Sequence, residues 1–498
     1  PGVTQGLRIT TRGNSASIFN AALSWIIERR LAKNDTMHLA FWARRVSSEA
    51  AYIRAQAIVE RNGGNFSKSV TLQLPVSSTA WQRFQVPFRM DDDYAPGGAA
   101  MRFQFGAGPQ SFEIAGVTLL TFGTRATPQQ LPMETTYPGR NDQALVSAAR
   151  ERIEQFRKAA VIVRVTDADG NAVPGASVTV QQLSHAFRFG SAVVAANLMG
   201  TAADDAIYRS RIESHFTTAV LENDLKWPFW EANTAFPQAR TRAAIDWLEA
   251  RGIPVRGHNL IWPSWRNSPA GLQSLAPDAL RDRITNRFRS ALTDAGLNGR
   301  LYHWDVQNEP FDNFDVQGRI PGVAGVEASN GVLGNSEAVR WFQLARQFDP
   351  AAKLFLNDYD TFEGGGTEGA HARYALAFLK YLIDNGAPVD GFGFQGHFST
   401  PAPLDVADTM VQRFAGVFNG DLAVTEFDLN TPDEALQADY TREFTRWIFS
   451  QPRFTDFLMW GFRERRHWLP AGAMYRADWS SKPNAIAWNN LWFLENWT

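Results

Sequence analysis

The stretch LYHWDVQNEP at residues 301–310, an apolar and aromatic run that ends in an amide and a carboxylate, decides the fold. Amphipathic stretches of helical period, such as SEAVRWFQLARQF at 336–348, separate it from similar runs. Those runs are FRFGSAV (187–193), TAVLEND (218–224), IPVRGHNLIW (253–262), KLFLNDY (353–359), GFGFQGHF (391–398), LAVTEFDLN (422–430) and DFLMWGF (456–462). Eight alternations of strand and helix predict the α/β class, as a (β/α)8 TIM barrel rather than an open doubly wound sheet.

The residues before the barrel follow a different pattern. Segments of period two, such as MHLAFWARR (37–45) and WQRFQVPF (81–88), predict an antiparallel β-sandwich over residues 1–123. A Pro- and Thr-rich linker and the helical stretch ALVSAARERIEQFRK follow within residues 124–160. The barrel domain then covers 161–498, and VIVRVTDADGNAVPGASVTVQQ (161–182) predicts a β hairpin at its start.

Composition excludes several functions. Lys+Arg 49 against Asp+Glu 51 gives a net charge of -2, so no nucleic-acid partner is expected and a neutral substrate is favoured. With Cys 0 there is no disulfide, thiolate nucleophile or cysteine metal site. No run of about 18 apolar residues occurs, so no membrane span is expected. No GxGxxG or GxxxxGK[ST] follows a predicted strand, so no nucleotide cofactor is expected.

Polar and aromatic side chains collect at the carboxyl ends of the predicted strands, where barrel active sites lie. Buried polar atoms require partners, so this collection indicates a ligand cleft. In chain order these residues are Glu222, Asn223, Lys226, His258, Trp262, Asn308, Glu309, Tyr359, Gln395, His397, Glu426 and Trp460.

Two glutamates each close an otherwise apolar strand, Glu309 in WDVQNEP on the fourth and Glu426 in VTEFD on the seventh. Each alone is equally well explained as a structural carboxylate, but the pair on those strands favours catalysis. Side chains from both strands point toward the barrel axis and can bring the carboxylates roughly 5 Å apart, the separation used for glycoside cleavage with retention. That chemistry requires one neutral and one ionised carboxyl, and His397 and Asn308 are the nearest candidate donors.

No metal site is expected. His258 and His397 lack the HxH or HExxH spacing of a metal site. The DADGN turn at 167–171 has no Glu at the twelfth position of a calcium loop, and DDDY at 91–94 favours a solvated acidic turn.

These motifs identify the family that the chain resembles. Residues 187 to about 493 resemble glycoside hydrolase family 10, the endo-β-1,4-xylanases. WDVQNEP resembles the acid/base segment and VTEFD the nucleophile segment, which implies those roles for Glu309 and Glu426. The resemblance also implies that the sugars on the glycone side are bound by Glu222, Asn223, Lys226, His258 and Trp262. It implies that Asn308 holds the 2-hydroxyl of the cleaved sugar and that Tyr359 lines the cleft. Gln395 and His397 would lie beside the nucleophile, and Trp460 and Trp468 would form an aromatic wall.

Two positions depart from the family pattern. Pro263 stands where a second histidine is usual, and Arg463 stands where an aromatic residue is frequent in a subgroup that also has the hairpin at 161–182. The resemblance therefore leaves contacts around the cleaved sugar and in the leaving-group half of the cleft undetermined.

The amino-terminal sandwich resembles a carbohydrate-binding module in LAFWARR and WQRFQVPF. Trp25, Trp42, Tyr52 and Trp81 are candidates for stacking on sugars, but their alternating positions favour the core.

The sequence thus predicts a retaining endo-1,4-β-xylanase with xylan and xylooligosaccharides as partners, without cofactor, and monomeric. A β-1,4-glucanase on the same barrel and a non-catalytic polysaccharide-binding protein remain alternatives. Polymeric xylan cannot cross a membrane, so we expect a secreted or periplasmic protein whose precursor carries an export signal upstream of Pro1.

Overall fold

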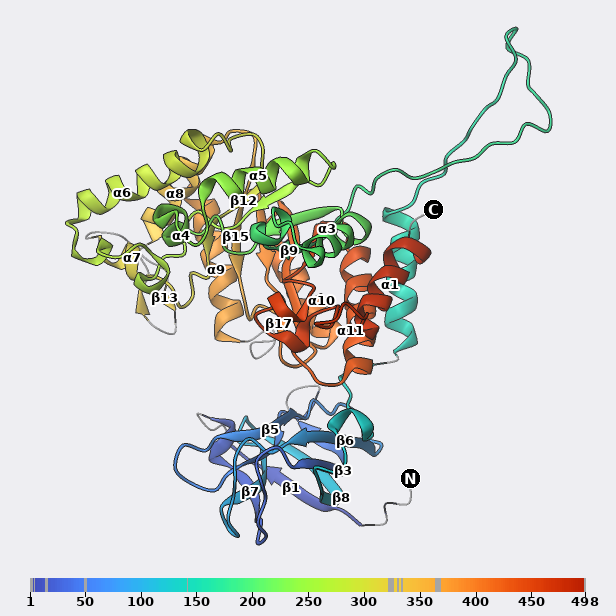
Figure 1. Ribbon diagram of the computed structural model, residues 1–498, viewed down its shortest axis with the longest axis vertical. Helices are drawn as coiled ribbons and strands as arrows, with labels where there is room; N and C mark the ends of the chain where they lie inside the picture. The colour runs from blue at the N-terminus through green and yellow to red at the C-terminus, as the bar shows by residue number, and fades with distance from the viewer. Residues whose placement is uncertain are drawn as a thin grey trace. The chain divides into compact units, whose positions relative to one another are not determined.

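The computed structural model describes residues 3, 5–13, 17–48, 52–140, 142–320, 327–328, 331–332, 335–362 and 369–496. The chain divides into two compact units (Figure 1). The first comprises Pro1–Asp142, Thr400–Leu404 and Thr431–Tyr440, and the second Gln143–Ser399, Asp405–Asn430 and Thr441–Thr498.

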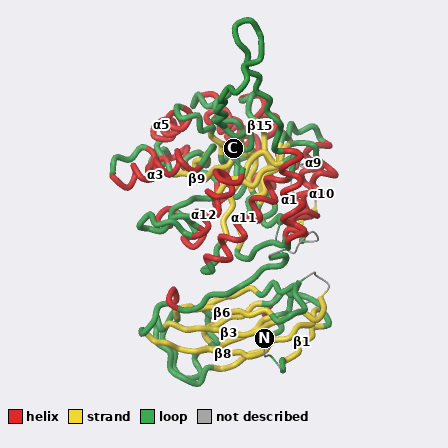
Figure 2. Tube along the Cα trace, turned by 90° about the vertical axis from the view of Figure 1, so that its right-hand side faces the viewer, coloured by secondary structure: helices red, strands yellow, loops and turns green. Residues whose placement is uncertain are grey.

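Two four-stranded antiparallel sheets form the first unit, which confirms the predicted β-sandwich. One sheet has the order β1 (Leu7–Thr11), β8 (Gln110–Gly123), β3 (Thr36–Ser48), β6 (Gln82–Arg89), and its strands lie side by side in Figure 2. The other has the order β2 (Ala22–Ile26), β7 (Ala99–Gln104), β4 (Gln56–Arg61), β5 (Lys68–Gln73).

Strand alternation decides which aromatic side chains enter the sandwich core. Phe41 and Phe84 are buried and stack at 5.1 Å, whereas Trp42 lies on the opposite side of β3 and is only partly buried. Trp81 is also partly buried, beneath the guanidinium of Arg44 at 4.6 Å. The expectation of core positions was wrong for all four aromatic candidates: Trp25, Trp42, Tyr52 and Trp81 are exposed or half-buried, because the phenylalanines occupy the inward positions.

Eight parallel strands close the barrel of the second unit, which confirms the predicted TIM barrel. The ring is closed by pairing of β19 with β9 and of β16 with β18, and the short strand β17 adds to β18. The eight barrel strands are β9 (Arg188–Val193), β10 (Thr218–Leu221), β11 (Val255–Gly257), β12 (His303–Asn308), β15 (Lys353–Asp358), β16 (Gly391–Phe394), β18 (Asp421–Leu429) and β19 (Phe454–Met459), and the added strand β17 is His397–Phe398. A Cβ on Gly257 would lie 2.2 Å from the Trp304 ring, so glycine there makes room for a large buried side chain on the next strand.

Helices surround the barrel strands (Figure 1). α1 occupies the stretch for which a helix is expected before the barrel. None of the helices within the described ranges is both long and apolar enough to span a bilayer. The helices are α1 (Gln143–Phe156), α2 (Ala195–Leu198), α3 (Ala203–His215), α4 (Trp227–Ala232), α5 (Gln238–Glu249), α6 (Pro277–Arg289), α7 (Asp315–Gly318), α8 (Asn335–Phe348), α9 (Ala370–Asp384), α10 (Leu404–Val417), α11 (Glu434–Ser450) and α12 (Pro483–Asn489); a small pair, β13 (Glu327–Ala328) and β14 (Gly331–Val332), lies between α7 and α8.

The hairpin expected at 161–182 forms only its turn. Asp167 and Asn171 close it by a backbone bond of 2.9 Å, and one isolated bridge joins Thr166 and Ala172. Residues 161–181 are exposed throughout and contain no longer strand. An isolated two-stranded ribbon is marginal without a surface to pack on, which accounts for the missing ladder.

Candidate active site

A cavity of about 420 Å³ lies at the carboxyl ends of the barrel strands. It contains every residue singled out from the sequence except Asn223, and it adds Arg266. Its lining residues are Glu222, Lys226, His258, Trp262, Arg266, Asn308, Glu309, Tyr359, Gln395, His397, Glu426, Trp460 and Trp468.

Asn223 acts on the cleft through its neighbour. Its Oδ1 accepts a hydrogen bond of 2.9 Å from Lys226 Nζ, and this ammonium lies 5.4 Å and 5.9 Å from the ring centroids of Trp262 and Trp460. Burial lowers the pKa of Lys226 and raises the pKa of Glu222. One corner of the cleft therefore combines polar groups with indole faces, which suits a sugar.

Glu309 directly follows β12 with a left-handed backbone, φ 53°. Its N–H donates to Asn357 O at 2.8 Å, and its carbonyl accepts from Asn313 Nδ2 at 2.9 Å, so the strained position is held from both sides. Its Oε1 accepts a bond of 2.9 Å from Gln395 Nε2. Burial raises the pKa of Glu309 to about 7. The negative charge of Glu426 also raises this pKa, whereas the hydrogen bond from Gln395 lowers it.

Glu426 on β18 is buried among donors. Asn357 Nδ2 donates to its Oε1 at 2.7 Å, His397 Nε2 lies 3.1 Å from its Oε2, and His258 Nδ1 lies 3.7 Å from its Oε1. Burial alone would raise the pKa of Glu426, but the imidazoles and the Arg256 guanidinium outweigh burial and lower this pKa to about 2. The carboxylate is therefore ionised at neutral pH.

His397 is held as a cation between two carboxylates. Its Nδ1 lies 3.1 Å from Asp428 Oδ2, and these contacts raise the pKa of His397 to about 10 against the effect of burial. Trp468 Nε1 donates to the same Asp428 oxygen at 2.7 Å, and its ring lies 4.9 Å from the imidazole. Asp428 therefore positions both the donor to Glu426 and an aromatic wall of the cleft.

A second buried network lies beneath His258. Asp305 Oδ2 lies 2.7 Å from His258 Nδ1 and forms an ion pair with Arg256. His258, Asp305 and Glu426 are the one trio within the described part of the chain whose ligand atoms all lie within 4.8 Å of one another. Because Arg256 already neutralises Asp305, the trio needs no cation to satisfy its charge.

A chain of amides links the two glutamates. Asn308 Oδ1 accepts from Asn357 Nδ2 at 2.8 Å and from Gln395 Nε2 at 3.4 Å, and these two amides also donate to Glu426 and Glu309 respectively. Asn308 Nδ2 is buried and has no hydrogen-bond partner among the described residues, so it is a donor left for a ligand. The carboxylate separation of roughly 5 Å stays a prediction.

Arg463, the departure on the strand-eight segment, is not among the residues that line the cleft. It forms an ion pair with Asp204 and lies 4.2 Å from the ring centroid of Trp479. Tyr359, in contrast, lines the cleft and donates its hydroxyl to Asp312.

Several residues that support the site are not identified from the sequence: Asp428, Arg256, Asp305 and Arg266. Asn357 is recognisable as a polar residue at the end of the fifth strand, but no role is assigned to it. Asn357 and Asp428 had a signal, since Asn357 ends a strand and Asp428 shares a strand face with Glu426. The other three had none.

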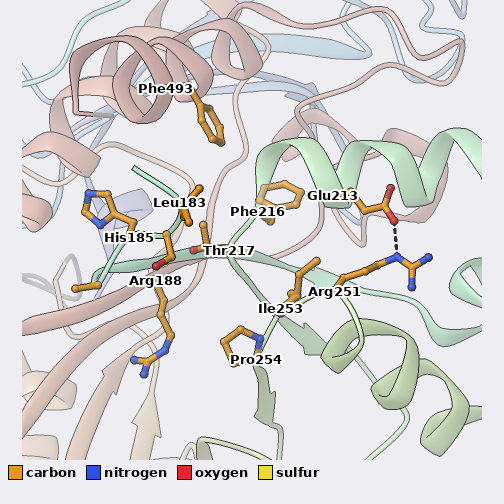
Figure 3. Close-up of a pocket in the computed structure, with 13 residues that line it drawn as sticks. Leu183, His185, Arg188, Glu213, Phe216, Thr217, Arg251, Ile253, Pro254 and Phe493 are labelled. Atoms are coloured by element: carbon orange, nitrogen blue, oxygen red, sulfur yellow. Dashed lines mark hydrogen bonds and ion pairs between the residues drawn. The ribbon is translucent and has the colours of Figure 1, made fainter. Parts of the chain in front are cut away.

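A larger cavity of about 720 Å³ lies at the opposite, amino-terminal ends of the strands (Figure 3). Its charged residues are already paired, Arg251 with Glu213 and Arg188 with Asp456. Residues at this end of a barrel serve stability, so the chemistry belongs to the other face.

A carboxyl group with a raised pKa and an ionised carboxylate, on two barrel strands beside indole rings, are features that a glycoside hydrolase requires. The sequence model of Glycosyl hydrolase family 10 matches residues 179–489, and the chain belongs to this family.

The chain is similar to several characterised proteins. It is 32% identical to "Anti-sigma-I factor RsgI6" of Acetivibrio thermocellus over 65% of this chain and 39% of that protein. It is 26% identical to "Endo-1,4-beta-xylanase 1" of Arabidopsis thaliana over 79% of this chain and 37% of that protein. The chain thus spans less than half the length of either relative. Xylanase 10B from Thermotoga petrophila RKU-1 shares the fold, with a TM-score of 0.53 and 20% identity over 61% of this chain and 94% of that one.

Proposed function

We propose that the protein is a retaining endo-1,4-β-xylanase that hydrolyses internal β-1,4 bonds of xylan by double displacement. The observation that carries the proposal is the opposed pKa pair, about 7 for Glu309 and about 2 for Glu426. A proton donor and an ionised nucleophile are thereby present together at neutral pH.

In the first step, a Glu426 oxygen attacks the anomeric carbon while Glu309 gives its proton to the departing glycosidic oxygen. In the second step, Glu309 takes a proton from water, whose oxygen displaces Glu426 and restores the β configuration. His397 remains bonded to the free Glu426 oxygen and keeps this carboxylate oriented.

The cleft residues are proposed to hold the sugars. Glu222, Lys226, His258 and Trp262 bind the glycone side, Asn223 supports this side by holding Lys226, and the free amide of Asn308 holds the 2-hydroxyl of the cleaved sugar. Tyr359 lines the cleft, Gln395 and His397 flank the nucleophile, and Trp460 and Trp468 cover the central sugars.

Hydrolysis of xylan and of a soluble cellulose derivative, measured side by side, tests this proposal. Preferential release of reducing ends from xylan, with an early fall in viscosity, is the expected endo-xylanase result. Preference for cellulose would identify a β-1,4-glucanase. Binding without release of reducing ends would identify a non-catalytic polysaccharide-binding protein.

We also propose that residues 1–123 act as a carbohydrate-binding module, residues 124–160 as linker and helix, and 161–498 as the catalytic domain. Trp42 and Trp81 lie outside the sandwich core and keep part of their rings accessible, which supports the first role, because indole rings stack on sugars. Replacing both with alanine in the full chain should reduce retention on insoluble xylan but not cleavage of short xylooligosaccharides. Unchanged retention would assign the sandwich a bracing role.

We further propose that the protein acts outside the cytoplasm, secreted or periplasmic, because polymeric xylan cannot cross a membrane. Fractionation of the source cells should find it there, and recovery in the cytoplasm would contradict this location. Light scattering should give the mass of one chain, and a larger mass would contradict the proposed monomer.

A further inference from the structure

Arg266 lines the active-site cleft although no barrel strand carries it. It lies in a 3-10 turn, Trp265–Asn267, on the loop that follows β11, and its side chain is exposed. Among the described residues, Arg266 forms no ion pair.

The backbone on both sides of Arg266 is fixed. Trp265 N–H donates to Asp315 Oδ2 at 3.0 Å, and Asn267 Nδ2 donates to Asn313 Oδ1 at 3.4 Å. Asn313 in turn donates to the carbonyl of Glu309 at 2.9 Å. The turn that presents Arg266 is therefore tied to the segment that carries the acid/base.

The other cationic side chains of the cleft are already engaged. Lys226 donates a hydrogen bond to Asn223 and interacts electrostatically with Glu426 and Glu222. His397 lies between Glu426 and Asp428. Arg266 thus adds a positive charge that the described protein does not neutralise. A guanidinium binds a carboxylate through two parallel N–H bonds, which neutral sugars cannot match.

We propose that Arg266 binds the carboxylate of a uronic acid substituent on the xylan backbone, so that the cleft prefers acidic, uronate-bearing xylan to a neutral chain. This inference rests on the proposed xylanase function and names its substrate class. Because Arg266 is exposed, the contact should raise kcat/KM on acidic xylan by only a modest factor, and this factor should decrease as added salt screens the charges.

The test compares two substrates that differ only in charge. One is a glucuronoxylan preparation, and the other is the same preparation after chemical reduction of its uronic acid carboxyl groups to alcohols. Initial rates at low substrate give kcat/KM for both with the full chain, and linear xylohexaose serves as a common neutral reference. We expect the acidic chain to be favoured about three- to tenfold at low salt, the range of a partly exposed charge-assisted contact.

Three variants assign the preference to this side chain. Arg266→Gln removes the charge at similar length and should bring the acidic-to-reduced ratio close to one. Arg266→Lys keeps the charge without the two-pronged geometry and should retain part of the ratio. Arg289→Gln, an exposed arginine at the end of α6 and outside the cleft, should keep the full ratio and its salt dependence.

Equal rates of the unmodified protein on both preparations, or a preference that Arg266→Gln leaves intact, would overturn the inference while leaving xylanase activity in place. No hydrolysis of xylohexaose or of either preparation would instead refute the proposed function. The two failures are therefore distinguishable.

Discussion

Glu309 is half-buried and Glu426 is buried, and the larger difference between the two carboxyl groups lies in their neighbours. Glu309 accepts a hydrogen bond from the neutral amide of Gln395, whereas Glu426 lies beside His397 and near the Arg256 guanidinium. Burial dominates at Glu309 and positive charge dominates at Glu426, so their pKa values move in opposite directions.

Replacing each glutamate should have different consequences. Glu426→Ala should lose at least about 10⁴-fold in kcat on every substrate, because no glycosyl-enzyme can form. Glu309→Ala should lose roughly 10²- to 10⁴-fold on xylan but retain most of its first step on an aryl xylobioside whose phenolate leaves unaided. Mass spectrometry should detect the accumulated covalent intermediate, and azide should release it as the β-glycosyl azide.

Glu151→Ala, an exposed glutamate on α1, is the matched control and should behave like the unmodified chain. If Glu309→Ala were equally inactive on activated and natural substrates, the assigned roles would be wrong. They would also be wrong if NMR showed that the first product of the unmodified protein is the α anomer.

The pH profile follows from the same two groups. Raising the pH through about 7 removes the proton that Glu309 must donate, so kcat/KM on xylooligosaccharides should fall there. On the acid side, kcat/KM should fall as the pH approaches about 2, where Glu426 gains a proton, provided that the protein stays folded. Initial rates across buffers of constant ionic strength measure both limbs. An alkaline limb that persists in Glu309→Ala on the aryl xylobioside would assign it to another group.

At the scale of elements, the site is built at the ends of β12, β15, β16 and β18, which are neighbours in that order around the barrel. Asn308 and Asn357 are paired in register across β12 and β15. Asn357 reaches Glu426 because β16 offers Gly393, where a Cβ would lie 2.3 Å from Asn357 Oδ1. Glycine is thus required in GFGF because side chains of the neighbouring strand β15 occupy the space that a Cβ would need.

Asn357→Ala should therefore lower kcat on xylooligosaccharides by about ten- to a hundredfold, because Glu426 and Asn308 lose a buried donor. Steady-state kinetics measure the loss, and circular dichroism at the assay temperature checks the fold. Asn385→Ala, an exposed asparagine at the end of α9, should leave kcat unchanged. An unchanged kcat in Asn357→Ala would show that the amide chain does not support the nucleophile.

At the scale of the whole molecule, the residues between sandwich and barrel have a role of their own. Thr135 Oγ1 donates to Asp433 Oδ2 at 2.7 Å, and the Tyr137 hydroxyl donates to Asp439 at 2.8 Å. Both pairs join residues within the first compact unit.

A truncated chain that starts at residue 143 should cleave short xylooligosaccharides at a rate close to the full chain, because every cleft residue lies beyond it. A chain that starts at residue 124 should be as active as the one that starts at residue 143 but should have a higher Tm than it, because the longer chain keeps the hydrogen bonds to Asp433 and Asp439. Calorimetry and initial rates measure the two effects. A folded but inactive shorter chain would show that the sandwich or linker contributes to the site.

The sequence alone determined the barrel, the sandwich and nearly all of the cleft. Strand alternation, helical period and the polar residue that ends each strand are local properties, and a closed barrel brings all such ends to one face. Glu309, Glu426 and His397 were therefore identifiable before any contact was known.

Tertiary structure decided what depends on partners far away in the chain. The protonation of Glu309 follows mainly from its desolvation, and that of Glu426 from charges on other strands. Arg463 pairs with Asp204 and does not line the cleft, and Arg266 enters the cleft from a loop without a sequence signal. Trp42 lies outside the sandwich core because neighbouring positions fill it. Burial and charge pairing are sums over contacts between distant segments, and no local pattern of residues contains them.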